Sequence, residues 1–463
     1  MIKTIVKYIL TFLITMLILI ALLFLSSLIP SKYLQENIKA SSEILIGEGE
    51  RIVIDAPLGK ASLFYFTDAL MINTAYSIDS NHPYKSMMLD RKNYIPGQTL
   101  NEHEEIEKHV GTSPNYVDKN ENTFQVAELY GLMHDDKIVD SYEYSRYWHG
   151  YLIFLRPLLA IMDLGGIRLL LLLLTVVLCI SLLFLIIKKL NRVTAIIYIV
   201  SFVMLNIFII CNSMNEITTF LITLIAMMVI LLKNGKFKNP ATVFLCIGIC
   251  TSFFDLLTTP LVTLGFTLPL YVLLNLKDNN KKLYIDCIKI CVAWAVGYGL
   301  CWALKWIITD ITLNKHILKD AINQILYRTG DSQAIDYSKV IILNINQMGS
   351  KAIIVTIILL AIYAIIGLVR ELYLEKSKFV KPTKIEFLKV LIFIIIAIFP
   401  FAWYFLIKNH SYIHCFFTNR ILFMTILNIQ IALTLYMGLQ DNLLKKELPE
   451  KADSKISTEK NEV

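Results

Sequence analysis

The chain has 463 residues, of which 56% are hydrophobic and only 17% are charged, and its formal net charge is +7. A soluble globular protein is less apolar and more charged than this, so the composition excludes an ordinary soluble domain. The positive balance does not require a nucleic-acid partner. The segment 30–150 is acidic, with 19 acidic and 11 basic side chains, and the excess of basic residues lies in other connections.

The apolar residues gather into runs of about 17 to 25, the length that crosses the hydrocarbon core of a bilayer. Ten such runs predict an all-α polytopic membrane protein with about ten transmembrane helices. The first run lacks a clear small-residue cleavage site, so we expect it to be retained. The runs lie near residues 6–29, 166–187, 193–211, 216–232, 241–257, 260–276, 284–308, 351–370, 386–407 and 420–438.

Basic residues predict the orientation of these spans, because cytoplasmic loops are enriched in Lys and Arg. Basic residues recur at the N-terminus and in every second connection, as in Lys188, Lys189 and Lys233, whereas the alternate short connections carry almost none. We therefore expect a multi-pass protein of the cell membrane with both termini in the cytoplasm.

After the first helix, residues 30–145 predict a small mixed α/β domain outside the membrane. The stretch 44–57 indicates a hairpin, and 62–76 and 123–134 indicate helices from their apolar spacing. Thr67-Asp68 is a helix-start signal. Asp68 is therefore a candidate general base, a metal ligand or a helix N-terminal carboxylate.

The rest of the chain alternates between membrane spans and segments at the outer edge. Residues 146–165 predict an aromatic, amphipathic helix in the membrane interface, and spans two to seven follow in 166–308. Residues 309–350 predict a second outer amphipathic segment, 351–438 hold spans eight to ten, and the charged tail 439–463 is expected to be disordered.

Asp255 is the most costly residue in the spans, since a carboxylate near the membrane must be paired or exposed to water. It lies in "FFDLLTTPLVTLG", just before Pro260. Two interpretations remain open. Asp255 belongs to a functional polar site, or it caps a helix at the break before Pro260.

"KNHSYIHCFFTNR", residues 408–420, places polar residues between the last two spans. His410 and His414 are one helical turn apart, so with a carboxylate they are candidate ligands of a divalent metal. Arg420 is a candidate for bidentate phosphate binding, or it only reaches to the membrane boundary. The chain has no Walker A loop and no HExxH motif, which excludes an ATP-driven pump acting alone.

Taken together, these features resemble the GT-C superfamily of integral membrane glycosyltransferases. The resemblance rests on the first helix, the block 30–150, the interfacial "SRYWHGYLIFLRPLL" and the outer segment 309–350. It implies transfer of a sugar from a polyprenyl-phosphate donor to a cell-envelope glycan or lipid acceptor on the outer face. The family often has an acidic pair early in the first outer loop. This chain instead offers Glu48 and Glu50, a single Asp68 and the late pair Asp135–Asp136, so the pattern does not fix the catalytic carboxylate.

The resemblance also implies roles for individual residues. Asp68 would take the proton from the acceptor hydroxyl, with His149 as a second catalytic group, and His410 and His414 would orient the substrate or hold a metal. The implied substrate-binding set is Asn409, His410, His414, Arg420, Arg146, Arg328 and Asp255. Two other functions stay open: a flippase or exporter of lipid-linked saccharides, and a non-catalytic GT-C-like membrane scaffold.

Overall fold

The computed structural model describes residues 2–56, 59–89, 91–94, 124–134, 140–277, 279–330, 335–374 and 384–440. The predictions about the pair Asp135–Asp136 and about the tail beyond residue 440 lie outside the described residues. Within them the chain is mainly helical, with two sheets of two antiparallel strands each.

Seven helical stretches are long and apolar enough to cross a membrane, and each coincides with a predicted run. They are Lys3–Ser27, Leu164–Lys189, Met214–Leu232, Asn280–Leu313, Ser350–Val369, Phe387–Leu406 and Cys415–Tyr436. The other three predicted runs correspond to shorter apolar helices, Arg192–Met204, Pro240–Phe254 and Val262–Leu274. The chain is therefore a multi-pass α-helical membrane protein, and the count of ten spans stays a prediction.

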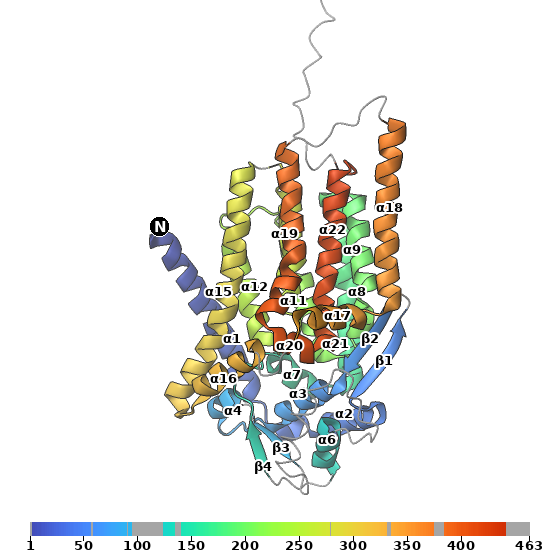
Figure 1. Ribbon diagram of the computed structural model, residues 1–463. Coiled ribbons are helices and arrows are strands. Elements are labelled where there is room, and N and C mark those ends of the chain that lie inside the picture. Colours follow the sequence, from blue (N-terminus) through green and yellow to red (C-terminus); the bar gives the residue numbers. More distant parts are fainter. Residues whose placement is uncertain are drawn as a thin grey trace, which may run out of the picture.

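These stretches form the bundle in the upper part of Figure 1. Its helices, in chain order, are α1 (Ile2–Ser27), α8 (Leu164–Lys189), α9 (Arg192–Met204), α10 (Ile207–Ile210), α11 (Met214–Leu232), α12 (Pro240–Phe254), α13 (Val262–Gly265), α14 (Thr267–Leu274), α15 (Asn280–Leu313), α18 (Ser350–Leu374), α19 (Lys384–Leu406) and α22 (Leu422–Tyr436).

Helices α12 and α15 pack closely against each other along the bundle. Gly248 of α12 lies against the backbone of Trp294, and Gly297 of α15 lies against the backbone of Leu245. Side chains at these two glycines would clash with the partner backbone. Small residues allow membrane helices to approach closely, and this contact fixes the position of α15, which contributes to the site below.

The segment after α1 forms a block at one end of the bundle (Figure 1). Its elements are η1 (Ser31–Tyr33), α2 (Gln35–Glu48), β1 (Arg51–Ala56), β2 (Gly59–Phe64), α3 (Tyr65–Ser77), α4 (Pro83–Leu89), β3 (Arg91–Tyr94), α6 (Phe124–His134) and β4 (Asp140–Glu143). Strand β1 pairs with β2 and strand β3 with β4.

Both predicted helices of this block are confirmed, as α3 and α6. The predicted hairpin is shifted along the chain. Residues 44–48 continue α2 instead of forming a strand, and the helix ends at Gly49, whose φ of 77° suits glycine. The hairpin then pairs Arg51 with Phe64 and Ala56 with Gly59.

The predicted interfacial segment 146–165 is helical only over α7 (Leu152–Leu159), and α8 begins at Leu164. Arg156 of α7 is fully buried and donates to the backbone carbonyls of Ser26, Ile29 and Ala75. It therefore joins α7 to the end of α1 and to α3. The outer segment 309–350 contains the end of α15, α16 (Ile317–Thr329) and α17 (Tyr337–Gln347).

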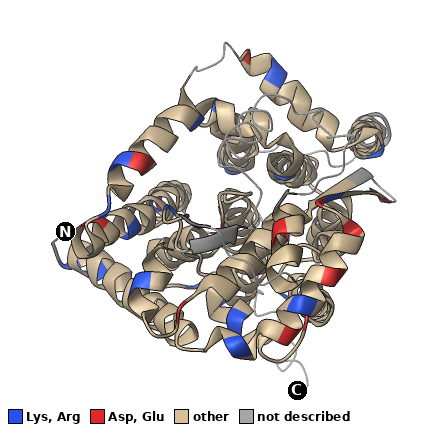
Figure 2. Cartoon of the chain, turned by 90° about the horizontal axis from the view of Figure 1, so that it is seen from below, with Lys and Arg blue, Asp and Glu red and all other residues tan. Residues whose placement is uncertain are grey.

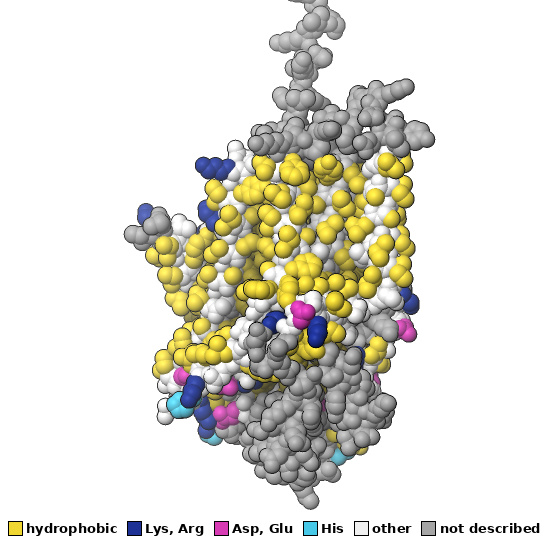
Figure 3. Space-filling view, viewed as in Figure 1, with side chains coloured by type: hydrophobic (Ala, Val, Ile, Leu, Met, Phe, Trp, Pro, Cys, Tyr) yellow, Lys and Arg dark blue, Asp and Glu magenta, His cyan; other side chains and the backbone are white. Residues whose placement is uncertain are grey.

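Short helices α20 (Lys408–Ile413) and α21 (Cys415–Thr418) and the turn η2 (Asn419–Ile421) connect α19 to α22. They lie at the same end of the bundle as α16, α17 and the block after α1 (Figure 1). On the face in Figure 3, hydrophobic side chains cover the bundle, acidic and histidine side chains lie toward its lower end, and Lys and Arg lie toward both ends. Figure 2, seen from below, shows acidic and basic residues interspersed. The described parts of the segments predicted to lie outside thus share one end.

Candidate functional site

Three sequence stretches that lie far apart in the chain meet at this end of the bundle. They are "YWHGYLIFLRPLL" (147–159), "FFDLLTTPLVTLG" (253–265) and "NHSYIHCFFTNR" (409–420). The Gly150 amide donates to the Phe253 carbonyl at 2.9 Å, and the Trp148 ring stacks on Phe253 with centroids 5.2 Å apart. A Cβ at position 150 would lie 2.5 Å from the Phe253 carbonyl oxygen, so only glycine permits this contact.

His410 connects the third stretch to the second and to α16. Arg328 Nη1 lies 2.9 Å from His410 Nδ1, and His410 Nε2 lies 3.0 Å from the Leu257 carbonyl oxygen. A guanidinium only donates, so Nδ1 accepts and Nε2 carries the hydrogen. Burial, with help from His414 and Arg328, lowers the pKa of His410 well below its usual value. His410 is therefore neutral, and both its nitrogens are engaged.

His414 lies beside it, with ring centroids 4.6 Å apart. Its Nδ1 is buried and has no hydrogen-bond partner among the described residues. Burial, followed by the charge of Arg328, lowers the pKa of His414 to about 3. The described part of the chain has no group of three or more His, Cys, Asp or Glu side chains that could hold a metal ion. The divalent metal at His410 and His414 stays a prediction, and only His414 offers a free ring nitrogen for it.

Arg328 is a half-buried arginine whose hydrogen-bond partners are neutral. Besides His410, its Nη2 donates to the Tyr147 hydroxyl at 3.2 Å. No ion pair to Arg328 occurs within the described residues. Its neighbour Arg146, in contrast, pairs with Asp320 at 2.9 Å. Among the described residues, no direct partner therefore compensates the charge of Arg328.

Two further predicted residues complete this part of the molecule. Asn409 donates from Nδ2 to the Tyr327 carbonyl at 2.7 Å, which ties α20 to α16. Asp255 ends α12 and is buried. It accepts from the amide of Thr258 at 3.0 Å and from its hydroxyl at 2.5 Å. Leu257 between them has φ 64°, a left-handed conformation that is costly for leucine, so the turn is tightly constrained.

Helix α15 supplies aromatic residues that sequence reasoning missed. Trp294, Tyr298, Trp302 and Trp306 recur every fourth residue and so share one helix face. This i, i+4 spacing was the available signal. Tyr298 lies within electrostatic range of Asp255, Tyr147 and Arg328. We call these groups, with His410 and His414, the Arg328 site. Its members are Tyr147, Asp255, Tyr298, Trp302, Arg328, His410 and His414.

A small cavity lies between α15 and α16. Its aromatic wall consists of Tyr147, Trp302 and Trp306, and Arg146 and Arg328 complete the lining with polar atoms. Helix α16 forms the opposite wall through Ala321 and Ile325. Arg328 is the arginine of this site that has no ion-pair partner among the described residues. In this cavity it lies next to aromatic rings.

His149 lies close to the Arg328 site, with its ring centroid 6.0 Å from that of Tyr147. Its Nε2 lies 2.8 Å from the Tyr144 carbonyl, and its Nδ1 lies 2.8 Å from the Tyr151 hydroxyl. Nε2 therefore donates and Nδ1 accepts. Burial lowers the pKa of His149 to about 3, and the charge of Lys305 adds to the effect. In this arrangement a neutral His149 holds the turn 144–151, and its catalytic role stays a prediction.

Asp68 lies in a different cluster. It is fully buried and accepts from the Ser213 hydroxyl at 3.1 Å and from the amides of Met214 and Asn215, both at 3.2 Å. These groups form the N-terminus of α11, where a carboxylate satisfies unpaired amides. Asp68 thus caps a helix, but the helix is α11 and not its own. Burial raises the pKa of Asp68 to about 6, and Arg168 opposes this shift.

Arg420 also lies in this second cluster. Its Nη2 contacts Glu216 Oε2 at 2.5 Å and donates to the Ser62 carbonyl at 2.9 Å, and the residue is only 5% exposed. Arg168 pairs with both oxygens of Glu48 at 2.8 Å. We call this cluster the Arg420 network. Its members are Glu48, Asp68, Arg168, Glu216 and Arg420, which amount to three acidic and two basic groups.

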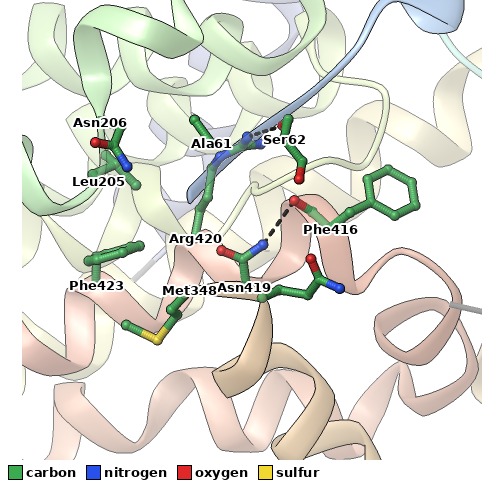
Figure 4. A pocket seen from close by; sticks show the side chains of 10 residues that line it. Ala61, Ser62, Leu205, Asn206, Met348, Phe416, Asn419, Arg420 and Phe423 are labelled. Carbon is green, nitrogen blue, oxygen red and sulfur yellow. Dashed lines mark hydrogen bonds between the residues drawn. The ribbon is translucent and has the colours of Figure 1, made fainter. Parts of the chain in front are cut away.

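Figure 4 shows the small polar cavity beside Arg420. Arg420 points toward Ser62, and Asn419 bonds to the Phe416 carbonyl at 2.9 Å. Asn206 completes the polar wall that the view labels. The charge of Arg420 is already balanced by Glu216, so this cavity presents no free positive charge to a phosphate.

The structure therefore divides the predicted site residues into two groups. Asp255, Asn409, His410, His414, Arg146 and Arg328 lie at or beside the Arg328 site, whereas Asp68 and Arg420 lie in the Arg420 network. Fold and site define a multi-pass helical membrane protein with a polar, aromatic site at one end of its bundle. No family model, no curated protein and no solved structure matches the chain.

Proposed function

We propose that this protein transfers a sugar from a polyprenyl-phosphate donor to a cell-envelope acceptor, and that the reaction takes place at the Arg328 site. The observation that carries the proposal is the uncompensated charge of Arg328 at the end of the bundle, where its partners are the neutral His410 and Tyr147. A guanidinium without a carboxylate partner is suited to bind the oxygens of a phosphate.

The proposal assigns the acceptor's proton to Asp255. A general base must lie within reach of the proton that it removes, and Asp255 lies in electrostatic range of Tyr298 in the Arg328 site. Asp68, which the sequence alone favoured, caps the start of α11 in the Arg420 network and is not a member of the Arg328 site. The proposed base is therefore Asp255, at the end of α12, and not Asp68 in the block after α1.

The donor's lipid tail needs an apolar surface that continues into the bilayer. Helix α16 offers one, because Ile322, Ile325 and Leu326 are exposed on the helix that carries Arg328. Hydrophobic side chains cover the bundle above it in Figure 3. A phosphate held at Arg328 would thus lie where the charged end of the protein meets its apolar surface.

A transfer assay tests the proposal. The full chain in detergent is given short-chain polyprenyl-phosphate sugars, and lipids from a deletion strain show which polyprenyl-linked sugar accumulates. Arg328→Gln should abolish transfer. Lys315→Gln is the matched control, because it removes a cation from a partly exposed pair with Glu143 nearby and should leave transfer unchanged.

Each alternative function predicts a different result. A flippase should show no transfer in detergent but should move a labelled sugar lipid across the bilayer of proteoliposomes. A scaffold should show neither activity. Transfer that survives Arg328→Gln at the wild-type rate would contradict the proposed phosphate site.

A further inference from the structure

The four aromatic residues on one face of α15 form what we call the aromatic ladder: Trp294, Tyr298, Trp302 and Trp306. Consecutive ring centroids lie 5.2, 6.1 and 5.6 Å apart, so each ring contacts the next. The aromatic residues are four positions apart, which corresponds to a rise of about 6 Å along the helix. The ladder therefore runs along α15 toward its outer end.

The polar groups of the two end residues of the ladder form hydrogen bonds, whereas those of the two middle residues form none among the described residues. Trp294 donates from Nε1 to the Thr263 hydroxyl at 3.0 Å, and Trp306 donates to the Arg146 carbonyl at 2.9 Å. The Tyr298 hydroxyl and Trp302 Nε1 are buried and have no hydrogen-bond partner in the part of the chain that the structure describes. A buried polar group without a partner costs about 1–3 kcal/mol, so two adjacent ones call for an explanation.

The side chains around Tyr298 and Trp302 are more typical of a ligand-binding site than of a hydrophobic core. Tyr147 packs edge-on against Trp302 with centroids 5.1 Å apart, and its hydroxyl accepts from Arg328. Trp302 and Arg328 both line the small cavity between α15 and α16. A bound molecule would meet aromatic faces and Arg328 in this cavity, and it would reach the buried Trp302 Nε1 and Tyr298 hydroxyl after a shift of the aromatic side chains.

We propose that Tyr298 and Trp302 bind the sugar ring of the ligand. The ring's hydroxyls would accept from Trp302 Nε1 and bond with the Tyr298 hydroxyl, which can both donate and accept. Its C–H face would pack on the aromatic rings. Arg328 and Asp255 contribute opposite formal charges, so beyond the phosphate a neutral, hydroxyl-rich ring fits this site better than a second anion.

This inference rests on the proposed function, which already places a sugar donor at this site, and it names the groups that read the sugar. Tyr298→Phe removes only the hydroxyl, and Trp302→Phe removes the N–H but keeps a ring. The unliganded protein loses no hydrogen bond in either variant, so its thermal unfolding temperature in detergent should stay the same or rise. A residue with a purely structural role would not combine unchanged stability with weaker binding.

Binding is measured apart from transfer, by saturation-transfer NMR of the full chain with a panel of methyl pyranosides of glucose, galactose, mannose and N-acetylglucosamine. At least one member should bind the wild type, and each variant should weaken that binding about tenfold, which is about 1.4 kcal/mol. Trp294→Phe is the matched control. It breaks the bond to Thr263, so it should lower the unfolding temperature and leave the sugar signal intact.

The outcomes separate the two proposals. Absence of binding by every panel member, or equal binding in wild type and both variants, overturns the sugar subsite even if transfer is found. Panel binding that depends on Tyr298 and Trp302, in a protein without transfer activity, supports the subsite and contradicts the proposed function.

Discussion

The Arg328 site and the Arg420 network both involve the segment 408–420: Arg328 contacts His410 near its start, and Arg420 lies at its end. Arg420 contacts Glu216 at 2.5 Å, whereas Arg328 contacts the neutral His410 at 2.9 Å and Tyr147 at 3.2 Å. The two arginines differ in whether a carboxylate compensates their charge. An arginine with a buried carboxylate partner holds elements together, and one with neutral partners can still bind an anion.

The residues around the two arginines also differ in how they are paired. The Arg420 network links α2, α3, α8, α11 and η2 through charged pairs and a capped helix. Both clusters contain buried polar atoms without a hydrogen-bond partner among the described residues. In the Arg420 network such atoms belong to Glu216 and Arg168, which are already paired with an opposite charge. In the Arg328 site they include the Tyr298 hydroxyl and His414 Nδ1, which belong to side chains without an ion pair among the described residues, and these make it the better candidate for a ligand site.

The largest effect on stability is expected from Glu216→Gln. The substitution leaves the Arg420 charge buried without its anion, and breaking a buried pair costs about 3–5 kcal/mol. Thermal unfolding in detergent and abundance in the membrane should both fall. Adding Arg420→Gln should recover part of the loss, because it removes the unpaired charge. A similar loss in Arg328→Gln would remove the distinction between the two regions.

The largest effect on transfer is expected from Asp255→Asn. Losing a general base lowers a rate by about a hundredfold or more. Asp68→Asn should keep transfer near the wild-type rate in protein of equal amount, because Asp68 caps α11 and lies in the other region. The measurement is the initial transfer rate per folded protein. If Asp68→Asn lowered the transfer rate more than Asp255→Asn, Asp68 would be the general base and the Arg420 network would be the reactive region.

A smaller effect is expected from replacing each arginine by lysine. Lysine is a point charge and cannot reproduce the two-donor fork of arginine. Arg328→Lys should lower the transfer rate about tenfold while the unfolding temperature stays constant. Arg420→Lys should lower the unfolding temperature, since Arg420 Nη2 contacts both Glu216 and Ser62. If Arg420→Lys alone impaired transfer in stable protein, Arg420 would be the phosphate residue.

The smallest effect concerns pH and Asp68. Burial raises its pKa from the ordinary 3.8 to about 6, so the folded state binds this proton more tightly than the unfolded state. Its contribution to stability then grows as pH falls through 6 and is complete below about 4. From pH 7.5 to 5, the unfolding temperature of wild type relative to Asp68→Asn should rise by about 2 °C. A constant difference over this range would show that Asp68 does not titrate there.

Much of the architecture could be read from the sequence. The apolar runs placed all ten helical regions, and the spacing of apolar residues placed α3 and α6. The aromatic ladder was also readable from its spacing of four, although the sequence analysis did not use it. The hairpin was misplaced because residues 44–48 suit a helix as well as a strand, and the helical turn that precedes Gly49 decided between them.

Only the tertiary structure decided which charged groups meet. Arg420 and Ser62 are 358 positions apart, Asp68 and Met214 are 146 apart, and Arg328 and His410 are 82 apart. Hydropathy is a sum over neighbouring residues, so a short window of sequence contains it. Whether an arginine is neutralised depends on a partner that the fold brings from elsewhere in the chain, and no local pattern distinguishes Arg328 from Arg420.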